Sequence, residues 1–268
     1  MNNFGIRLTP MVKILAIACI AGFLLQQTAD RFMGGNLLGW FALVPMDVVG
    51  RFRIWQVATY SFLHGDIGHL VLNLLMLVFI GGEIEAVWGA ARFLKFYFSC
   101  VVFAGMFYLA LQLFTSGGGL HSPMVGASGG IYGLLMAYGL LFGDRVLLFM
   151  MLFPMKAKHF VWVLAAVEFF STLFSGTGGG GVASAAHLGG MVAGFAYLWF
   201  WAAWRVSKRK RGESAAQADV RARTERVKQA AHLRLVKGDT SPEGGETRDR
   251  KPGPGGGGKK GDDGPTWH

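Results

Sequence analysis

Charged residues are scarce in this chain. Asp, Glu, Lys and Arg make up 16% of its 268 residues, and hydrophobic residues make up 52%, with a mean hydropathy of +0.39. A soluble globular domain carries about 25% charged residues. The shortage of charge argues against an ordinary soluble enzyme and predicts a membrane protein.

Cysteine is nearly absent. The only two, Cys19 and Cys100, both lie inside apolar runs. This placement excludes a disulfide framework and gives no metal-ligand spacing. A metal site made of His64, His69 and His121 is conceivable, but no spacing supports it. We therefore expect no metal and no cofactor, and we expect His64 and His121, which fall in loops, to contact solvent.

Acidic residues are also few, and the resulting charge of +10 is unevenly distributed. Residues 1–204 carry +3, and residues 205–268 carry +7 in a Gly-rich context. We predict a membrane domain over 1–204 and a basic cytoplasmic tail over 205–268. The tail is expected to be largely disordered, with a short charged helix possible at 214–237. The basic run at 207–211 predicts attraction to anionic lipids and not to nucleic acid.

Long apolar runs are what the chain has in abundance. A helix needs roughly 20 apolar residues to cross the hydrocarbon core. Six segments fit, which predicts an all-α membrane protein with a six-helix bundle: 11–29, 68–88, 93–114, 126–142, 159–175 and 184–204. We expect the first to be a retained helix, since no clear cleavage site follows it. The apolar stretch 146–153 is too short to span, so we expect an interfacial segment or a helix extension.

The distribution of Lys and Arg among the loops predicts the orientation. If the N-terminus is cytoplasmic, the inner segments carry most of the positive charge, and the outer loop 30–67 carries only three arginines. This bias favours both termini inside. Six spans without a targeting peptide suggest a prokaryotic plasma membrane. The aromatic residues of loop 30–67 suit a segment that lies in the membrane interface.

Polar residues recur near the outer ends of three of these spans. The second carries His69, with Asn73 one turn deeper, the fourth carries Ser128, and the sixth carries His187. Polar groups inside a membrane are costly and often functional. Their shared depth predicts one site assembled from three helices.

Spacing adds geometry to this site. Ser128 and Tyr132 are four residues apart and share a helix face. Ser128 also lies near a helix N-terminus, where free backbone N–H groups favour an oxyanion. Glycines such as Gly126 and Gly129 let another backbone approach closely. The pair Gly190 and Gly194 would let the sixth span pack on the fourth, bringing His187 to Ser128.

Four blocks, in order over roughly residues 50–200, resemble the rhomboid family. They are WQVATYSFLHGDIGHLVLN at 55–73 with His-x-x-x-Asn, GGEIEAVWG at 81–89, GASGGIYG at 126–133 with Gly-x-Ser-Gly, and AHLGGMVAG at 186–194 with Ala-His-x-x-Gly. Many members have Trp-Arg where this chain has Trp55-Gln56. That departure concerns how the outer loop is anchored.

The resemblance implies a six-helix bundle around a water-filled cavity and cleavage of transmembrane segments of other membrane proteins. It implies that Ser128 is the nucleophile and His187 the base. It assigns His69, Asn73 and the backbone N–H of Ser128 to the oxyanion site, and it places Tyr132 against the His187 ring.

The expected chemistry is a serine–histidine dyad, because we expect no acidic residue at the depth of His187. Asp66 is a weak candidate for that role, and Glu168 lies deeper in the fifth span, where we expect a protonated or hydrogen-bonded structural glutamate. Two other functions stay open: a catalytically inactive rhomboid-like protein that binds membrane clients, and a small transporter. The internal repeat that a transporter would favour is not found.

Overall fold

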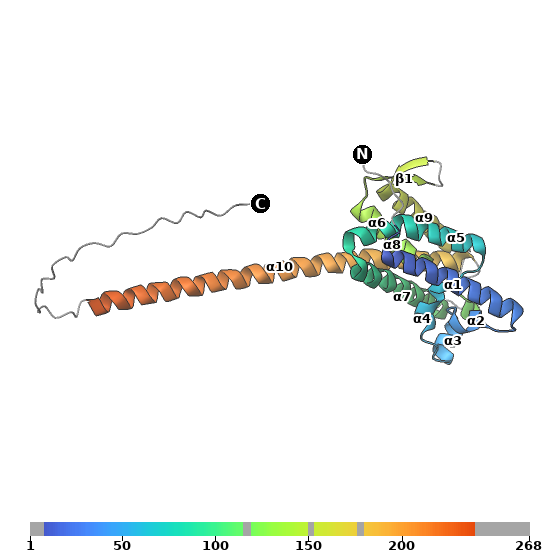
Figure 1. Cartoon of the computed structure of the whole chain (residues 1–268), viewed down its shortest axis with the longest axis horizontal. Coiled ribbons are helices and arrows are strands. Elements are labelled where there is room, and N and C mark those ends of the chain that lie inside the picture. Colours follow the sequence, from blue (N-terminus) through green and yellow to red (C-terminus); the bar gives the residue numbers. More distant parts are fainter. Residues whose placement is uncertain (1–7, 115–118, 150–152, 176–179, 239–268) are drawn as a thin grey trace, which may run out of the picture. The chain divides into compact units, whose positions relative to one another are not determined.

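The computed structural model describes residues 8–114, 119–149, 153–175 and 180–238. Chain contacts divide it into Met1–Ser207 and Lys208–His268. The first unit is a bundle of helices (Figure 1). Its main helices are α1 (Pro10–Phe32), α5 (Ile67–Met76), η2 (Leu77–Gly81), α6 (Gly82–Trp88), α7 (Ala90–Phe114), α8 (Ser128–Leu141), α9 (Ala157–Ser175) and the first part of α10 (Gly180–Gly238).

Contacts at both ends of α1 show how it runs against α5, η2 and α6. At one end, the Glu85 carboxylate accepts hydrogen bonds from the backbone N–H groups of Met11 and Val12 at 3.0 and 2.9 Å. These are first-turn groups that have no partner within the helix. At the other end, the Gln26 side chain bonds the backbone of His64 in both directions. Glu85 therefore ties the end of α6 to the start of α1, and α1 is antiparallel to α5–η2–α6.

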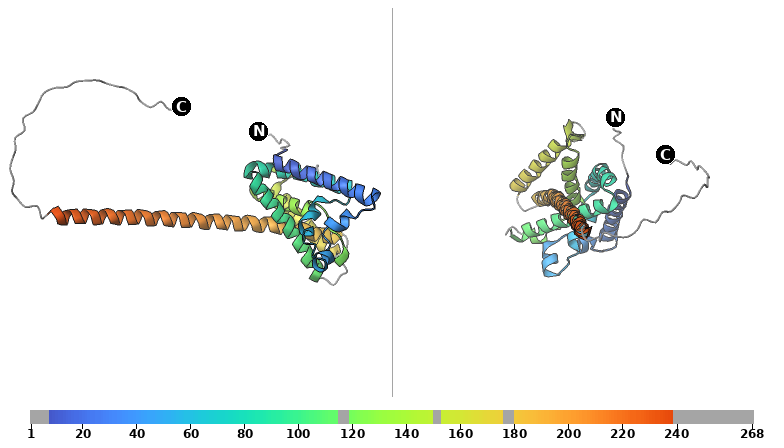
Figure 2. Two further views of the ribbon diagram at one scale, coloured as in Figure 1. Left: turned by 60° about the horizontal axis from the view of Figure 1, so that its bottom comes forward. Right: turned by 90° about the vertical axis from the view of Figure 1, so that its left-hand side faces the viewer.

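Helix α7 forms much of the core. Three of its aromatic side chains, Phe93, Phe96 and Tyr97, are fully buried. In contrast, α1 lies along one side of the bundle (blue in Figure 2), and only 22% of an apolar 18-residue stretch of this helix is buried. Its outward side chains, such as Ile14 and Leu25, are exposed and apolar. An apolar exterior is what lipid contact requires.

Residues 33–66 fold into short helices at the end of the bundle where α5 begins. They are α2 (Leu37–Phe41), α3 (Pro45–Gly50), α4 (Gln56–Thr59) and η1 (Tyr60–Phe62), grouped together in Figure 1. Gln56 is completely buried, accepts from Val44 N–H at 3.1 Å and donates to the Gly39 carbonyl at 3.1 Å. Arg53 also donates to Gly39, at 2.9 Å, and pairs with Asp47. Gln56 therefore anchors this segment through its amide.

Of the two alternatives for residues 146–153, the helix extension is wrong for the residues that the structure describes there. The described residues there belong to two antiparallel paired strands, β1 (Val146–Phe149) and β2 (Phe153–Lys156), at the opposite end of the bundle from α3 (Figure 1). β-Branched and aromatic residues favour a strand, and Pro154 is tolerated in an edge strand. The membrane part is therefore not purely helical.

Four described helical segments are long and apolar enough to cross a membrane: Pro10–Phe32, Ile67–Trp88, Ala90–Phe114 and Ala157–Phe174. Their bounds lie within three residues of the predicted ones. The fourth predicted span corresponds to α8, which is apolar but has 14 residues. The sixth falls within α10.

Helix α10 continues beyond residue 204, the predicted end of the last span, as far as Gly238. Residues 205–238 contain no proline and two glycines, Gly212 and the terminal Gly238, and they are rich in Ala, Arg, Lys, Glu and Gln, which favour helices. Ion pairs at i,i+4 spacing, such as Arg209–Glu213, add modest support. The short charged helix expected as possible at 214–237 is therefore present as part of a helix that covers residues 205–238, and the disorder predicted for residues 239–268 lies outside the described residues.

Candidate active site

Ser128 is the first residue of α8, and the turn before it is fixed by glycine. Gly126 has φ of +120°, a conformation that side chains rarely adopt, and its N–H donates to the Tyr60 carbonyl at 3.0 Å. A Cβ atom at Gly126 would lie 2.7 Å from His69 Cε1 and 3.6 Å from Ser128 Oγ. The turn therefore sets the serine hydroxyl and the edge of the His69 ring around the same point.

His187 reaches this hydroxyl from α10. The distance between His187 Nε2 and Ser128 Oγ is 2.8 Å, within hydrogen-bonding range. The close approach of α8 and α10 depends on glycine. A Cβ at Gly190 would lie 2.1 Å from the Gly129 carbonyl oxygen, and one at Gly194 would lie 2.8 Å from the Gly133 carbonyl oxygen. The predicted tight packing of these helices through Gly190 and Gly194 is confirmed.

Two further side chains contact the His187 ring. Tyr132 stacks on it with ring centres 4.1 Å apart and planes 7° apart. Glu168 Oε1 lies 3.0 Å from His187 Nδ1 and also accepts a hydrogen bond from the Tyr132 hydroxyl. The expectation that no acidic residue reaches His187 is wrong, because Glu168 comes up from α9.

Sequence reasoning noticed Glu168 but misjudged its reach. A carboxylate in the middle of an apolar helix is a strong signal, since burying it unpaired is costly. Position along a span predicts only the depth of Glu168, whereas its contact with His187 also depends on how α9 is rotated and placed against α10. His187 and Glu168 side chains are 18% and 10% exposed, so the pair is largely shielded from solvent.

His69 lies on α5 beside the serine turn, and Asn73 is four residues further along the same helix. The His69 backbone N–H donates to the Asp66 side chain at 2.8 Å, which caps α5. The Asn73 amide donates to the His69 carbonyl at 2.9 Å, and the residue is buried. Asp66 therefore caps a helix, and the structure gives it no bond to His187 within the described residues.

The expectation of solvent contact is wrong for His64, although His121 is exposed. His64 is completely buried, and within the described chain neither of its ring nitrogens has a hydrogen-bond partner. Its ring meets that of His69 edge-on at 5.2 Å. Burial, assisted by repulsion from His69, lowers the pKa of His64 to about 4, so its ring is neutral at pH 7.

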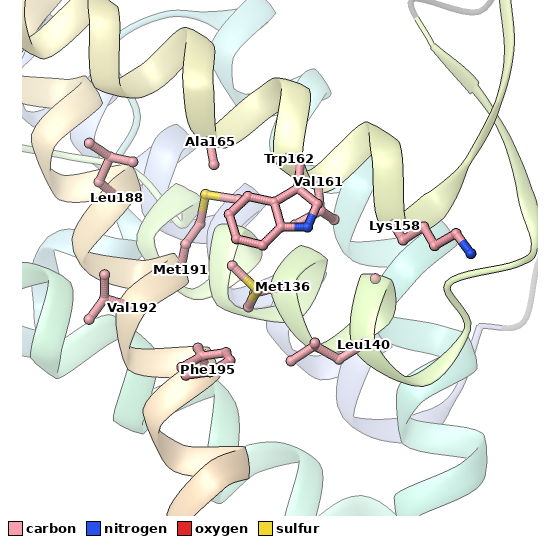
Figure 3. Close-up of a pocket in the computed structure, with 11 residues that line it drawn as sticks. Met136, Leu140, Lys158, Val161, Trp162, Ala165, Leu188, Met191, Val192 and Phe195 are labelled. Carbon is pink, nitrogen blue, oxygen red and sulfur yellow. The ribbon is translucent and has the colours of Figure 1, made fainter.

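An apolar groove of about 330 Å³ lies next to the site, between α8, α9 and α10 (Figure 3). Met136 and Met191, four residues beyond Tyr132 and His187, line it together with Trp162. None of the polar residues of the site lines this groove, so it is a surface adjacent to the polar site. Over the described residues, no cluster of His, Cys, Asp or Glu could hold a metal ion.

Comparison with known proteins gives a domain match and several similar proteins. A rhomboid domain matches residues 51–204, more than half of the chain. Human rhomboid-related protein 3 is 34% identical over 43% of this chain and 25% of its own length. Rhomboid protease GlpG from Yersinia pseudotuberculosis is 27% identical over 72% of this chain and 62% of its own length, and that from Salmonella choleraesuis is 25% identical over 71% and 62%.

The chain thus spans between a quarter and about three fifths of these relatives' lengths. The domain match covers α5 to α9 and α10 up to residue 204, including every residue of the site described above. Together with its apolar helices, this match makes the chain a multi-pass integral membrane protein. The chain belongs to the rhomboid family.

Proposed function

We propose that this protein is an intramembrane serine endopeptidase that cleaves transmembrane segments of other membrane proteins near the outer face of the membrane. The distance of 2.8 Å between Ser128 Oγ and His187 Nε2 carries this proposal. A nucleophile and a base at such a distance are the minimum arrangement for acyl transfer. The GlpG relatives are named rhomboid proteases, in agreement with it.

In this mechanism, His187 Nε2 takes the Ser128 proton as Oγ attacks the scissile carbonyl carbon. The tetrahedral intermediate collapses to an acyl-enzyme, and the imidazolium gives its proton to the leaving amine. A water molecule then attacks the ester with His187 as base, which restores the serine hydroxyl. Tyr132 keeps the imidazole ring in plane through its stacking contact.

The negative charge on the tetrahedral intermediate needs donors. We assign this role to the backbone N–H of Ser128 at the start of α8, the His69 ring and the Asn73 amide. Asn73 uses one N–H for the His69 carbonyl, which leaves the second available. Losing one donor from such a site typically costs about 10²–10³ in kcat.

The proposed setting is a six-span bundle in a prokaryotic plasma membrane with both termini in the cytoplasm. The site then lies toward the outer side, where α5 and α8 begin. The basic stretch from residue 205 onward would contact anionic lipids on the cytoplasmic side. The substrates would be transmembrane proteins, and the exposed apolar exterior of the bundle suits their approach through the bilayer.

A cleavage assay tests this function. The purified protein in detergent, or reconstituted in liposomes, is mixed with a model single-span substrate, and the products are mapped by mass spectrometry. We expect the parent to cut, and Ser128→Ala and His187→Ala each to reduce cleavage to background with unchanged helicity. Equal cleavage by all three proteins would overturn the proposal.

The alternative is a rhomboid-like protein that captures membrane clients without cutting them. It predicts that the parent leaves the substrate intact and that all three proteins retain it equally in a pull-down from detergent. The presence of both Ser128 and His187 at bonding distance favours the protease.

A further inference from the structure

Glu168 occupies the position that completes a row of three groups. Its Oε1 atom lies 3.0 Å from His187 Nδ1, and His187 Nε2 lies 2.8 Å from Ser128 Oγ. The three residues come from α9, α10 and α8, so no local sequence motif joins them. Glu168 is 7% exposed, and a buried carboxylate is tolerated only when it is paired and hydrogen-bonded.

Hydrogen bonding at this carboxylate selects the state of the histidine ring. An ionised carboxylate only accepts hydrogen bonds, so the proton between Glu168 and His187 belongs to Nδ1. The neutral ring carries one proton, and Nε2 therefore presents its lone pair toward Ser128. This is the tautomer that a general base needs. When Nε2 takes the serine proton, the ring becomes cationic beside a carboxylate.

Tyr132 holds the same oxygen from another direction. Its ring stacks on His187, and its hydroxyl donates to Glu168 Oε1. The two bonds to one oxygen fix the carboxylate relative to the imidazole plane. Thr172 on the next turn of α9 donates to the Glu168 carbonyl and does not compete for the carboxylate.

We propose that Glu168 is a positioning residue of the protease, which holds the Nδ1-protonated form of His187 and stabilises the imidazolium, so that the working unit is Ser128–His187–Glu168. Glu168 acts through His187 and does not touch the substrate. This inference rests on the proposed function and specifies more than a serine–histidine dyad.

Charge and size can be separated at this position. Glu168→Gln keeps the size but presents an amide, which can donate to Nδ1 and favour the wrong tautomer. Glu168→Asp keeps the charge but is one methylene shorter. We expect kcat to be highest for the parent, lower for Glu168→Asp and lowest for Glu168→Gln, with KM unchanged. For Glu168→Gln, kcat should be about 10²–10⁴-fold below that of the parent. The corresponding acid-to-amide change in soluble serine proteases lowers kcat about 10⁴-fold. A purely structural glutamate would tolerate the isosteric Gln better than Asp.

The assay uses the full chain in liposomes with the single-span substrate, and Tm and helicity are measured for every variant. Glu85→Gln is the matched control, since Glu85 is another buried carboxylate, but it bonds the N-terminus of α1. We expect this control to lower Tm while kcat stays within about twofold of the parent, because Glu85 lies at the other end of the bundle.

If Glu168→Gln does not fold, Tyr132→Phe decides, because it keeps the stacked ring and removes only the hydroxyl that pins Glu168. The loss of one hydrogen bond predicts a fall in kcat of about 3- to 10-fold at constant KM. Parental kcat in a folded Glu168→Gln variant, or in Tyr132→Phe, would overturn the role proposed for Glu168 and leave the proposed protease function standing. An inactive parent would instead count against the proposed protease.

Discussion

The site is built from single side chains whose neighbours leave little freedom. Ser128 follows a turn that only glycine accommodates without strain, and His187 is held between the Tyr132 ring and the Glu168 carboxylate. Beside them, His64 is buried with no hydrogen-bond partner for its ring among the described residues. Each of these constraints yields an expectation for a point variant.

Gly126→Ala tests the turn. The new methyl group would lie 2.7 Å from His69 Cε1 in a backbone conformation with φ of +120°. A strained residue of this kind costs about 1–3 kcal/mol. We expect the substrate-cleavage rate to fall at least about tenfold as His69 or the turn shifts. Gly65→Ala is the control, because a Cβ there meets nothing within 4 Å, and its cleavage rate should remain close to that of the parent.

His64 predicts an acid sensitivity of the fold. Its pKa is about 4 in the folded protein and 6.5 in the reference state, so the unfolded chain binds the proton more readily between these values. The contribution of this residue to stability is therefore full above about pH 6.5 and falls by about 3 kcal/mol as the pH drops toward 4. Thermal unfolding at stepwise pH should show a steeper acid decline for the parent than for His64→Phe. Identical declines of Tm in the parent and in His64→Phe would contradict this role of His64.

At the scale of elements, hydropathy is enough to predict where the four long apolar helical segments begin and end. The predicted segments match α1, α5–η2–α6, α7 and α9 because a run of about 20 apolar residues has few alternatives in a membrane. The polar residues at matching depths also predicted that α5, α8 and α10 share one site. These inferences depend on order along the chain, which the sequence contains directly.

Three features could not be predicted from hydropathy: the strand pair, the contact of Glu168 with His187 and the length of α10. The apolar stretch 146–153 has no periodicity that separates a strand from a short helix, and only the pairing of Val146–Phe149 with Phe153–Lys156 identifies a strand. The contact between Glu168 and His187 depends on the rotation of each helix about its axis, which hydropathy does not report. The continuation of α10 to Gly238 follows from helix propensity, which a change from apolar to charged composition obscured.

The packing of α8 on α10 gives a prediction about a helix pair. Gly190→Leu would place a side chain where even a Cβ lies 2.1 Å from the Gly129 carbonyl oxygen. We expect the helices to separate, Tm to fall and cleavage to be lost, since His187 would move away from Ser128. Gly212→Leu is the control, because a Cβ there meets nothing within 4 Å, and it should keep the parental Tm and cleavage activity. Parental activity in Gly190→Leu would contradict the close packing.

At the scale of the whole molecule, the chain combines an apolar bundle with a separate basic unit from Lys208. Residues 208–238 are helical, and their side chains that the structure describes are exposed. Exposed positive charge next to a membrane span is typical of the cytoplasmic side. The two units therefore make an orientation of the chain testable.

Labelling of one added cysteine at a time in intact cells tests this orientation. Cys19 and Cys100 are buried, so they give little background with a membrane-impermeant maleimide. We expect Phe52→Cys, at a position 77% exposed between α3 and α4, to label from outside. Ser214→Cys should label only after the membrane is permeabilised. The reverse pattern would place the site on the cytoplasmic side.

The central claim is that His187 activates Ser128, and covalent labelling measures this most directly. A fluorophosphonate reacts with an activated serine by forming an O–P bond and releasing fluoride. We predict that the folded protein is labelled at Ser128 and that His187→Ala lowers the labelling rate at least about 10³-fold at unchanged Tm. Labelling at another serine, or an equal rate in His187→Ala, would contradict the account.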